Sequence, residues 1–132
     1  MTILPQWVLC EASGKKQLQV FSAAPSYQNA LVKPPLAGSK DAELCDELVS
    51  AQYEAIAKMA VIRSISTGER VPVHFTLVGQ GVFNNPPSVI ATSLKKAAQV
   101  AKGYPLVNIY VHGYSSAIRI KFAQRWILPS LV

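Results

Sequence analysis

The amino-acid sequence predicts an α/β protein with a three-layer α/β/α architecture and a mainly parallel (mixed) sheet. Three observations support this prediction. Segments rich in β-branched and aromatic residues alternate with segments whose apolar residues recur every three or four positions. Half of the residues are hydrophobic and 15% are charged, which excludes an intrinsically disordered chain. The length of 132 residues suits one domain, so we treat residues 1–132 as a single unit.

The first predicted strand covers residues 17–24, and Pro25 ends it. Residues 25–39 then form an irregular loop with three prolines, which is long enough to have a function of its own.

A long helix is expected over residues 41–66, with Gly68 placed to end it. We attribute its early acidic residues to the positive end of the helix dipole rather than to a catalytic cluster. One apolar stripe is predicted to face the core. The acidic residues are Asp41, Glu43, Asp46 and Glu47, and the stripe is Leu44, Leu48, Ala51, Ala55, Met59 and Ile62.

Residues 71–112 predict a strand, a loop, a helix and a second strand. The first strand, residues 71–78, is apolar enough to be buried over most of its length. The second covers residues 106–112, and a right-handed crossover with parallel pairing is expected between them. The helix begins at Ser88 and ends at Gly103. Its predicted apolar face is Ile90, Leu94, Ala97 and Ala101.

The C-terminal residues 116–132 leave two interpretations open. Apolar and basic residues alternate over 118–122, as in an edge strand, whereas Trp126, Ile127 and Leu128 suit an apolar cap or a docking tail. Through this tail the chain could form a homo- or hetero-oligomer. That possibility is the alternative function, a non-catalytic interaction or assembly subunit.

Charge is distributed unevenly along the chain. Residues 1–69 hold all seven acidic residues, and residues 70–132 hold seven Lys or Arg and no Asp or Glu. The basic half is expected either to meet an anion or to form a solvated face. Nucleic acid is a disfavoured partner, because no stripe of basic residues with interleaved aromatics is present.

Membrane, metal and secretory classes are also disfavoured. No stretch approaches the ~20 apolar residues of a membrane span, and Pro5 interrupts any signal-peptide core. We therefore expect a cytoplasmic or other reducing compartment. Cys10 and Cys45 are expected to be small buried thiols rather than metal ligands, and no cofactor is predicted.

The loop between residues 78 and 88 has the composition of an anion cradle. Glycines allow close approach of the backbone, and the loop leads into a helix N-terminus, where free amides favour phosphate. It is neither a Walker loop nor a dinucleotide fingerprint. The alternative is a tight turn that needs glycine for geometry alone. The candidate binding residues are Gly79, Gln80, Gly81, Val82, Phe83, Asn84 and Asn85.

This loop, with an apolar strand before it and an alanine-rich helix and strand after it, resembles the second phosphate-binding loop of macro domains, which reads approximately Thr-Gly-Ile-Tyr-Gly-Tyr-Pro. Residues 20–27 resemble the family's strand that ends in Gly-Pro and an aromatic residue, and residues 44–65 resemble its long helix. The resemblance covers about residues 17–115. It corresponds to the C-terminal half of a macro domain, in a divergent or truncated form.

The resemblance implies binding of ADP-ribose or of an ADP-ribosylated protein. By position, the amides of Gly81, Val82 and Phe83 would hold the diphosphate, and Phe83 would pack beside the distal ribose. Asn84 replaces the family's usual glycine, and Tyr114 could flank the adenine. Some macro-like proteins hydrolyse ADP-ribosyl linkages, but the family's N-terminal Asn-Ala-Asn-like segment and catalytic loop are not found here. The catalytic residues are therefore unknown.

We expect different roles for the two histidines. His74, inside the strand 71–78, is expected to be structural. His112 lies at the carboxyl end of its strand, where ligands of α/β sheets bind, and is a candidate ligand contact. A nucleophilic triad is not expected, because the second half has no acid to orient a histidine.

Overall fold

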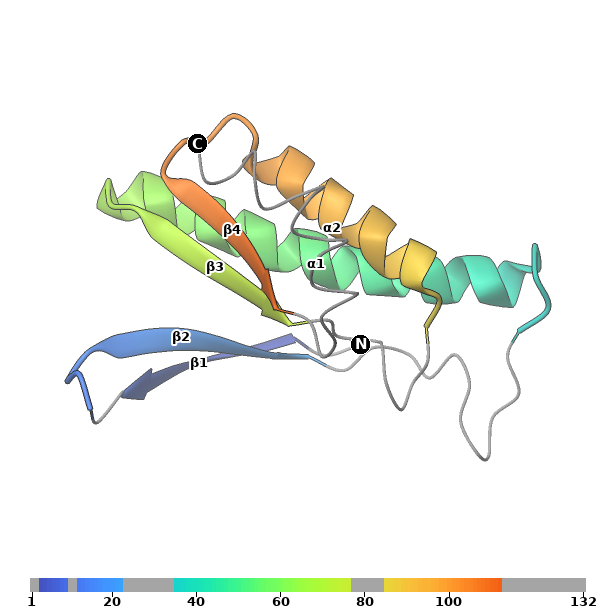
Figure 1. The fold of residues 1–132 in the computed structure, drawn as a ribbon, viewed down its shortest axis with the longest axis horizontal. Coiled ribbons are helices and arrows are strands. Elements are labelled where there is room, and N and C mark those ends of the chain that lie inside the picture. The colour runs from blue at the N-terminus through green and yellow to red at the C-terminus, as the bar shows by residue number, and fades with distance from the viewer. Residues whose placement is uncertain (1–2, 10–11, 23–34, 77–84, 113–132) are drawn as a thin grey trace.

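The computed structural model describes residues 3–9, 12–22, 35–76 and 85–112. It confirms the α/β class, but the described strands form two small sheets instead of one (Figure 1). β1 pairs with β2 in antiparallel fashion, and β3 pairs with β4 in parallel. The elements in chain order are β1 (Ile3–Leu9), β2 (Lys16–Ser22), α1 (Lys40–Thr67), β3 (Val71–Thr76), α2 (Pro87–Ala101) and β4 (Val107–His112).

Strand β1 was not predicted from the sequence. Pro5 lies in the middle of it and pairs with Val20 of β2. Proline cannot donate to a β-ladder, so it is tolerated mainly on edge strands. Because β1 has a described neighbour on one side only, Pro5 fits there. Strand β2 confirms the strand predicted at 17–24, ending at Ser22.

Helix α1 confirms the predicted long helix within one residue at each end. The side chain of Ser39 caps its start, since the Ala42 amide donates to Ser39 Oγ at 3.3 Å. Gly68 ends it in the left-handed conformation, with φ of 68°, and its amide donates to the Ser64 carbonyl. Asp41 and Glu43 lie in the first turn, as the dipole argument requires.

The predicted apolar stripe of α1 is wrong. Leu44 and Ile62 are 57% and 65% exposed, and the other four members are only half-buried. Apolar residues occur on more than one side of this helix, so the spacing alone does not select the side that is covered. The face of α1 that packs against α2 and β3 is a neighbouring one, and it combines small residues with one aromatic ring. Its core residues are Val49, Tyr53, Ala57, Ala60 and Val61.

The predicted unit of strand, helix and parallel strand is confirmed for β3, α2 and β4. Ile90, Leu94 and Ala97 are buried on α2 as expected. The expectation that β3 is buried over most of its length is wrong: residues alternate between the core and an exposed face. Both helices pack against the same face of this pair, so the other face remains open among the described residues.

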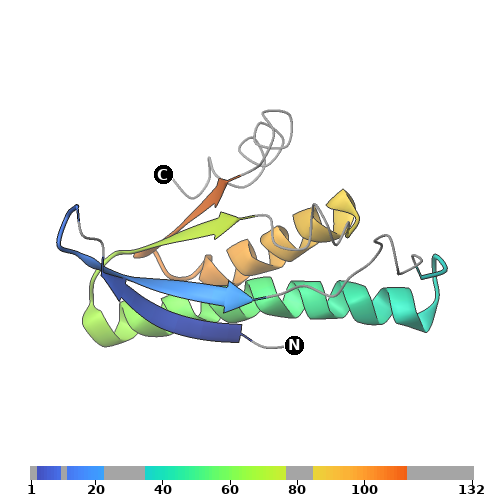
Figure 2. The same cartoon turned by 90° about the horizontal axis from the view of Figure 1, so that it is seen from below.

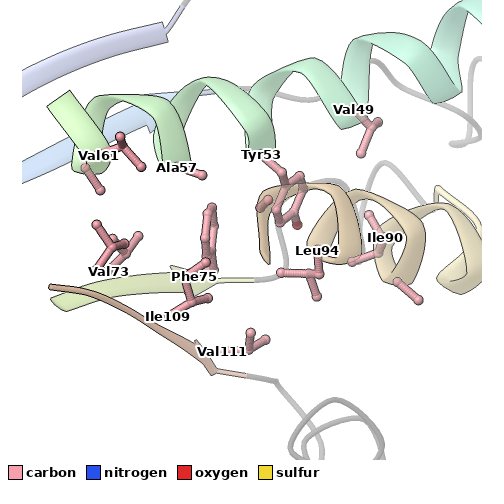
Figure 3. Close-up of a cluster of buried hydrophobic side chains, with 14 residues drawn as sticks. Val49, Tyr53, Ala57, Val61, Val73, Phe75, Ile90, Leu94, Ile109 and Val111 are labelled. Carbon is pink, nitrogen blue, oxygen red and sulfur yellow. The ribbon is translucent and has the colours of Figure 1, made fainter. Parts of the chain in front are cut away.

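The core lies between the two helices and one face of the β3–β4 sheet (Figure 3). Tyr53 of α1 stacks on Phe75 of β3, with ring centroids 5.3 Å apart. Below them, Ile109 and Val111 of β4 complete the apolar layer, and Leu94 of α2 fills its side. The described residues thus form two layers, and the third layer expected from the sequence stays a prediction.

The four strands lie in the spatial order β1, β2, β3, β4 in both overall views (Figures 1 and 2). Strands β2, β3 and β4 run in the same direction, so their carboxyl ends point to the same side of the molecule. Residues 25–34 of the loop predicted over 25–39, and the whole predicted tail over 116–132, lie outside the described residues.

Candidate functional site

The carboxyl ends of β3 and β4 meet at one edge of their sheet. Thr76, the last residue of β3, is in register with His112, the last residue of β4. Helix α2 begins on this side and runs back along the sheet (Figure 2). In open α/β sheets this edge is where ligands bind. Here it is defined by Thr76, His112 and the start of α2 at Pro87.

Most of the predicted binding residues fall outside the described part of the chain. These are Gly79, Gln80, Gly81, Val82, Phe83, Asn84 and Tyr114. The described structure nevertheless fixes both ends of the loop that carries the first six, because β3 ends at Thr76 and α2 begins at Pro87. The loop must therefore connect the carboxyl edge of the sheet to a helix N-terminus, as an anion cradle requires.

The first turn of α2 offers few amide donors. Residues 86 and 87 are prolines and have no N–H, and the amides of Val89 and Ile90 both donate to the Pro86 carbonyl, at 3.0 and 3.3 Å. Proline is favoured at such positions because the first amides of a helix have no intrahelical acceptor. A phosphate at this helix would consequently depend on the Ser88 amide, on the dipole and above all on amides of the preceding loop.

Asn85 and His112 are the two predicted contacts within the described residues. Asn85 is 2% exposed, so the residue lies inside the protein just before α2. His112 is exposed at the end of β4, on the open face of the sheet. The structure therefore places His112 at the same edge as the loop ends, about where the sequence argument expected it.

His74, which the sequence suggested to be structural, has two ring neighbours on the open face. Its Nδ1 lies 2.9 Å from Nε2 of His112, and its ring stacks on Tyr110 at 4.9 Å between centroids. Burial lowers the pKa of His74 below its usual 6.5, and the neighbouring His112 lowers it further. The three rings form one cluster on the open face, which we call the ring cluster (His74, Tyr110, His112).

The ring cluster was not predicted from the sequence, because its members lie on two strands whose relative register no local pattern gives. Parallel pairing puts His74 directly beside Tyr110, and His112 follows on the same face two residues later. The spacing of Tyr110 and His112 was visible in the sequence, but the register that adds His74 was not. The rings of His74 and Tyr110 in this cluster stack on one another, and the N–H and O–H groups of the cluster can donate hydrogen bonds to an anion.

Metal and membrane sites receive no support from the described residues. Over 3–9, 12–22, 35–76 and 85–112, no three His, Cys, Asp or Glu side chains gather in a group that could hold a metal ion. Within the same ranges, no helix has the length and apolarity that a membrane crossing requires.

A second feature is a groove between the two sheets, with a volume of about 720 Å³. Every residue of β2 and β3 lines it, and α1 supplies its floor, which includes Tyr53, Ile56, Met59 and Ala60. Trp7 of β1 lies at one side under the guanidinium of Arg63, 4.6 Å from the ring centroid. We call this feature the inter-sheet groove.

Comparison of the chain with protein-family models, with curated proteins and with solved structures finds no match.

Proposed function

We propose that the protein is a binding module for ADP-ribose or a related nucleoside diphosphate, with a macro-like α/β fold whose third layer lies outside the described residues. The ligand would bind at the carboxyl edge of β3 and β4. The proposal concerns binding and assigns no catalytic residue.

One observation carries the proposal. The glycine-containing loop connects the end of the parallel strand β3 to the start of α2, so that its amides and the helix dipole would act at the same edge. In this arrangement the amides of Gly81, Val82 and Phe83 would hold the diphosphate. Asn84 and Asn85 tolerate the left-handed backbone angles that would help direct successive amides toward one anion.

The position of the ring cluster at this edge supports the proposal that the ligand binds there. His112 ends β4 beside the end of β3, and Tyr110 and His74 extend the cluster along the open face. Imidazole and phenol rings can stack on a ribose or base and donate to its hydroxyl or phosphate oxygens. Beyond the end of β4, Tyr114 would be the residue placed to flank the adenine.

Isothermal titration of the full chain with ADP-ribose tests the proposal. We expect saturable heat at up to millimolar ligand, and loss of that heat in the Gly81→Glu variant, since a carboxylate would fill the cradle and repel the diphosphate. Gly103→Glu is the matched control, because it adds the same charge beyond the opposite end of α2, where a Cβ atom at position 103 meets no neighbouring atom within 4 Å.

Two results would contradict the proposal. One is the absence of heat with ADP-ribose while circular dichroism shows an intact fold. The other is equal binding by the Gly81→Glu and Gly103→Glu variants, which would show that the loop does not hold the ligand.

A further inference from the structure

We propose that the inter-sheet groove binds an extended peptide segment of a partner protein, which inserts as a strand between β2 and β3 and carries an acidic residue at one end. The proposal goes beyond nucleotide binding, because it concerns a different surface and a different class of ligand.

The backbone of β3 supplies the first argument. The Val71 amide donates to the Leu106 carbonyl at 2.7 Å, so the backbone groups of Val71 face β4. In a parallel ladder, alternate residues face opposite sides. The backbone groups of Pro72, His74 and Thr76 therefore point away from β4, toward the groove.

Two further observations agree with this orientation. Tyr53 in the groove floor donates its hydroxyl to the Thr76 carbonyl at 3.4 Å, which requires that carbonyl to point away from β4. Pro72 has no N–H, and its position on the unpaired side means that the β3–β4 ladder loses no donor. An inserted strand would find the carbonyls of Pro72 and His74 as acceptors and the amides of His74 and Thr76 as donors.

Strand β2 presents a second unpaired edge to the same groove. It pairs only with β1 among the described strands, and all of its residues line the groove. Since β2 and β3 run in the same direction on either side of the groove (Figures 1 and 2), one extended segment could pair with both edges. The insertion would join two two-stranded sheets into one sheet, the mode of recognition known as strand addition.

The hairpin of β1 and β2 would be stabilised by an inserted strand. A two-stranded hairpin is marginally stable in water unless its apolar face is covered. Trp7 and its cross-strand partner Leu18 share one face of the hairpin and are 49% and 36% exposed, and Phe21 on the other face is 51% exposed. An inserted strand would add backbone hydrogen bonds to the hairpin and would cover the apolar groove floor formed by Ile56 and Met59.

Charge at one end of the groove selects the kind of peptide. Lys16 begins β2, Arg70 precedes β3 and Arg63 lies in the last turns of α1, and all three line the groove. The Arg63 guanidinium lies over the Trp7 ring, and the Arg70 guanidinium donates to Asn108 Oδ1 at 3.0 Å. Glu69 is the acidic residue among the groove-lining residues. A peptide with a carboxylate at this end complements the cations. The chain's own segment 118–122 fits less well, because it carries Arg119 and Lys121 and no acid.

Peptide titrations of the full chain test the proposal. The probes are synthetic seven-residue peptides of alternating Val and Thr, blocked at both ends, with one Asp at the amino end or at the carboxyl end. We expect saturable binding of at least one of them, and the end that carries the preferred Asp gives the direction of insertion. Replacing Asp by Lys should weaken binding about tenfold, and Arg70→Glu should reverse the preference.

Backbone pairing is tested with N-methylated versions of the binding peptide. Methylation of the odd-numbered amides blocks pairing with one edge, and methylation of the even-numbered amides blocks pairing with the other. We expect both versions to lose binding. Retained binding by either peptide would overturn insertion between two edges, and no binding by any Asp peptide to the folded chain would overturn the proposal as a whole.

Hydrogen exchange of the His74 and Thr76 amides distinguishes a partner peptide from two other possible occupants of the groove, another segment of the same chain and a second copy of the protein. Without peptide, both amides should exchange rapidly, and saturating peptide should slow their exchange. Slow exchange in the absence of peptide would overturn the proposal. If that protection is independent of protein concentration, the chain itself fills the groove; if it increases with concentration, a second copy does.

Discussion

Nδ1 of His74 and Nε2 of His112 lie 2.9 Å apart, across two strands that the sequence separates by 38 residues. One imidazole must donate a proton to the other, so this hydrogen bond requires at least one neutral ring. Two protonated rings at this distance would repel each other. The contact makes the open face of the β3–β4 sheet sensitive to acid.

The first prediction concerns this acid sensitivity. Because the pKa of His74 is lowered in the folded protein, the unfolded chain binds a proton at higher pH than the folded chain does. The contribution of His74 to stability is therefore fully retained above its unfolded pKa of 6.5. It decreases as the pH falls from 6.5 toward the lower pKa of the folded protein. We expect a loss of about 1–2 °C in Tm between pH 7.5 and 5, measured by circular dichroism, since His74 is largely exposed.

The two causes of the lowered pKa can be separated with the His112→Asn variant. Burial is the larger cause and remains, so the pKa of His74, followed by NMR, should rise but stay below 6.5. A value unchanged from the parent protein would contradict a contribution from His112.

The second prediction concerns which face of α1 and α2 is buried. Leu94 is 1% exposed among the core residues in Figure 3, so Leu94→Ala should reduce the free energy of unfolding by about 2–5 kcal/mol. Leu44→Ala is the control: this side chain is 57% exposed, and its truncation should cost less than about 1 kcal/mol. Urea denaturation measures both. Equal losses would instead support the apolar stripe that the sequence predicted for α1.

The third prediction concerns the end of α1. Gly68 has φ of 68°, a region in which a Cβ atom is strained, so Gly68→Ala should destabilise the protein by about 1–2 kcal/mol. Gly103 has no positive φ and open space around it, so Gly103→Ala should change stability by less than about 0.5 kcal/mol. A similar loss for the two variants in thermal unfolding would contradict the left-handed cap.

The fourth prediction concerns the reactivity of Cys45. Burial raises the pKa of this thiol, and the carboxylates of Asp46 and Asp41 raise it further. The thiolate is the reactive form, so alkylation by iodoacetamide at pH 8 should be slower in the folded protein than in urea. Asp46→Asn should accelerate it about two- to fivefold by removing one carboxylate. Peptide mass spectrometry distinguishes Cys45 from Cys10, and an unchanged rate in the variant would contradict the electrostatic contribution.

The candidate site was predictable in part. The sequence proposed the loop at 79–85 and His112 as candidate contacts, because glycines before a helix and a residue at a strand end are local patterns. Of these residues the structure describes Asn85 and His112. It did not identify the ring cluster, since His74 joins Tyr110 and His112 only through the register of β3 against β4. The inter-sheet groove was equally hidden, because it depends on two edges that belong to different sheets.

The sequence by itself determined the order of the elements from β2 to β4 and several of their ends, whereas β1 was not predicted from it. Ser39 and Gly68 bound α1 through capping interactions, and Pro87 opens α2, because these signals act within a few residues along the chain. The tertiary structure alone decided which side of α1 faces the core and which strand edges stay unpaired. Both features depend on shape complementarity between segments far apart in the sequence, which no local sequence pattern can indicate.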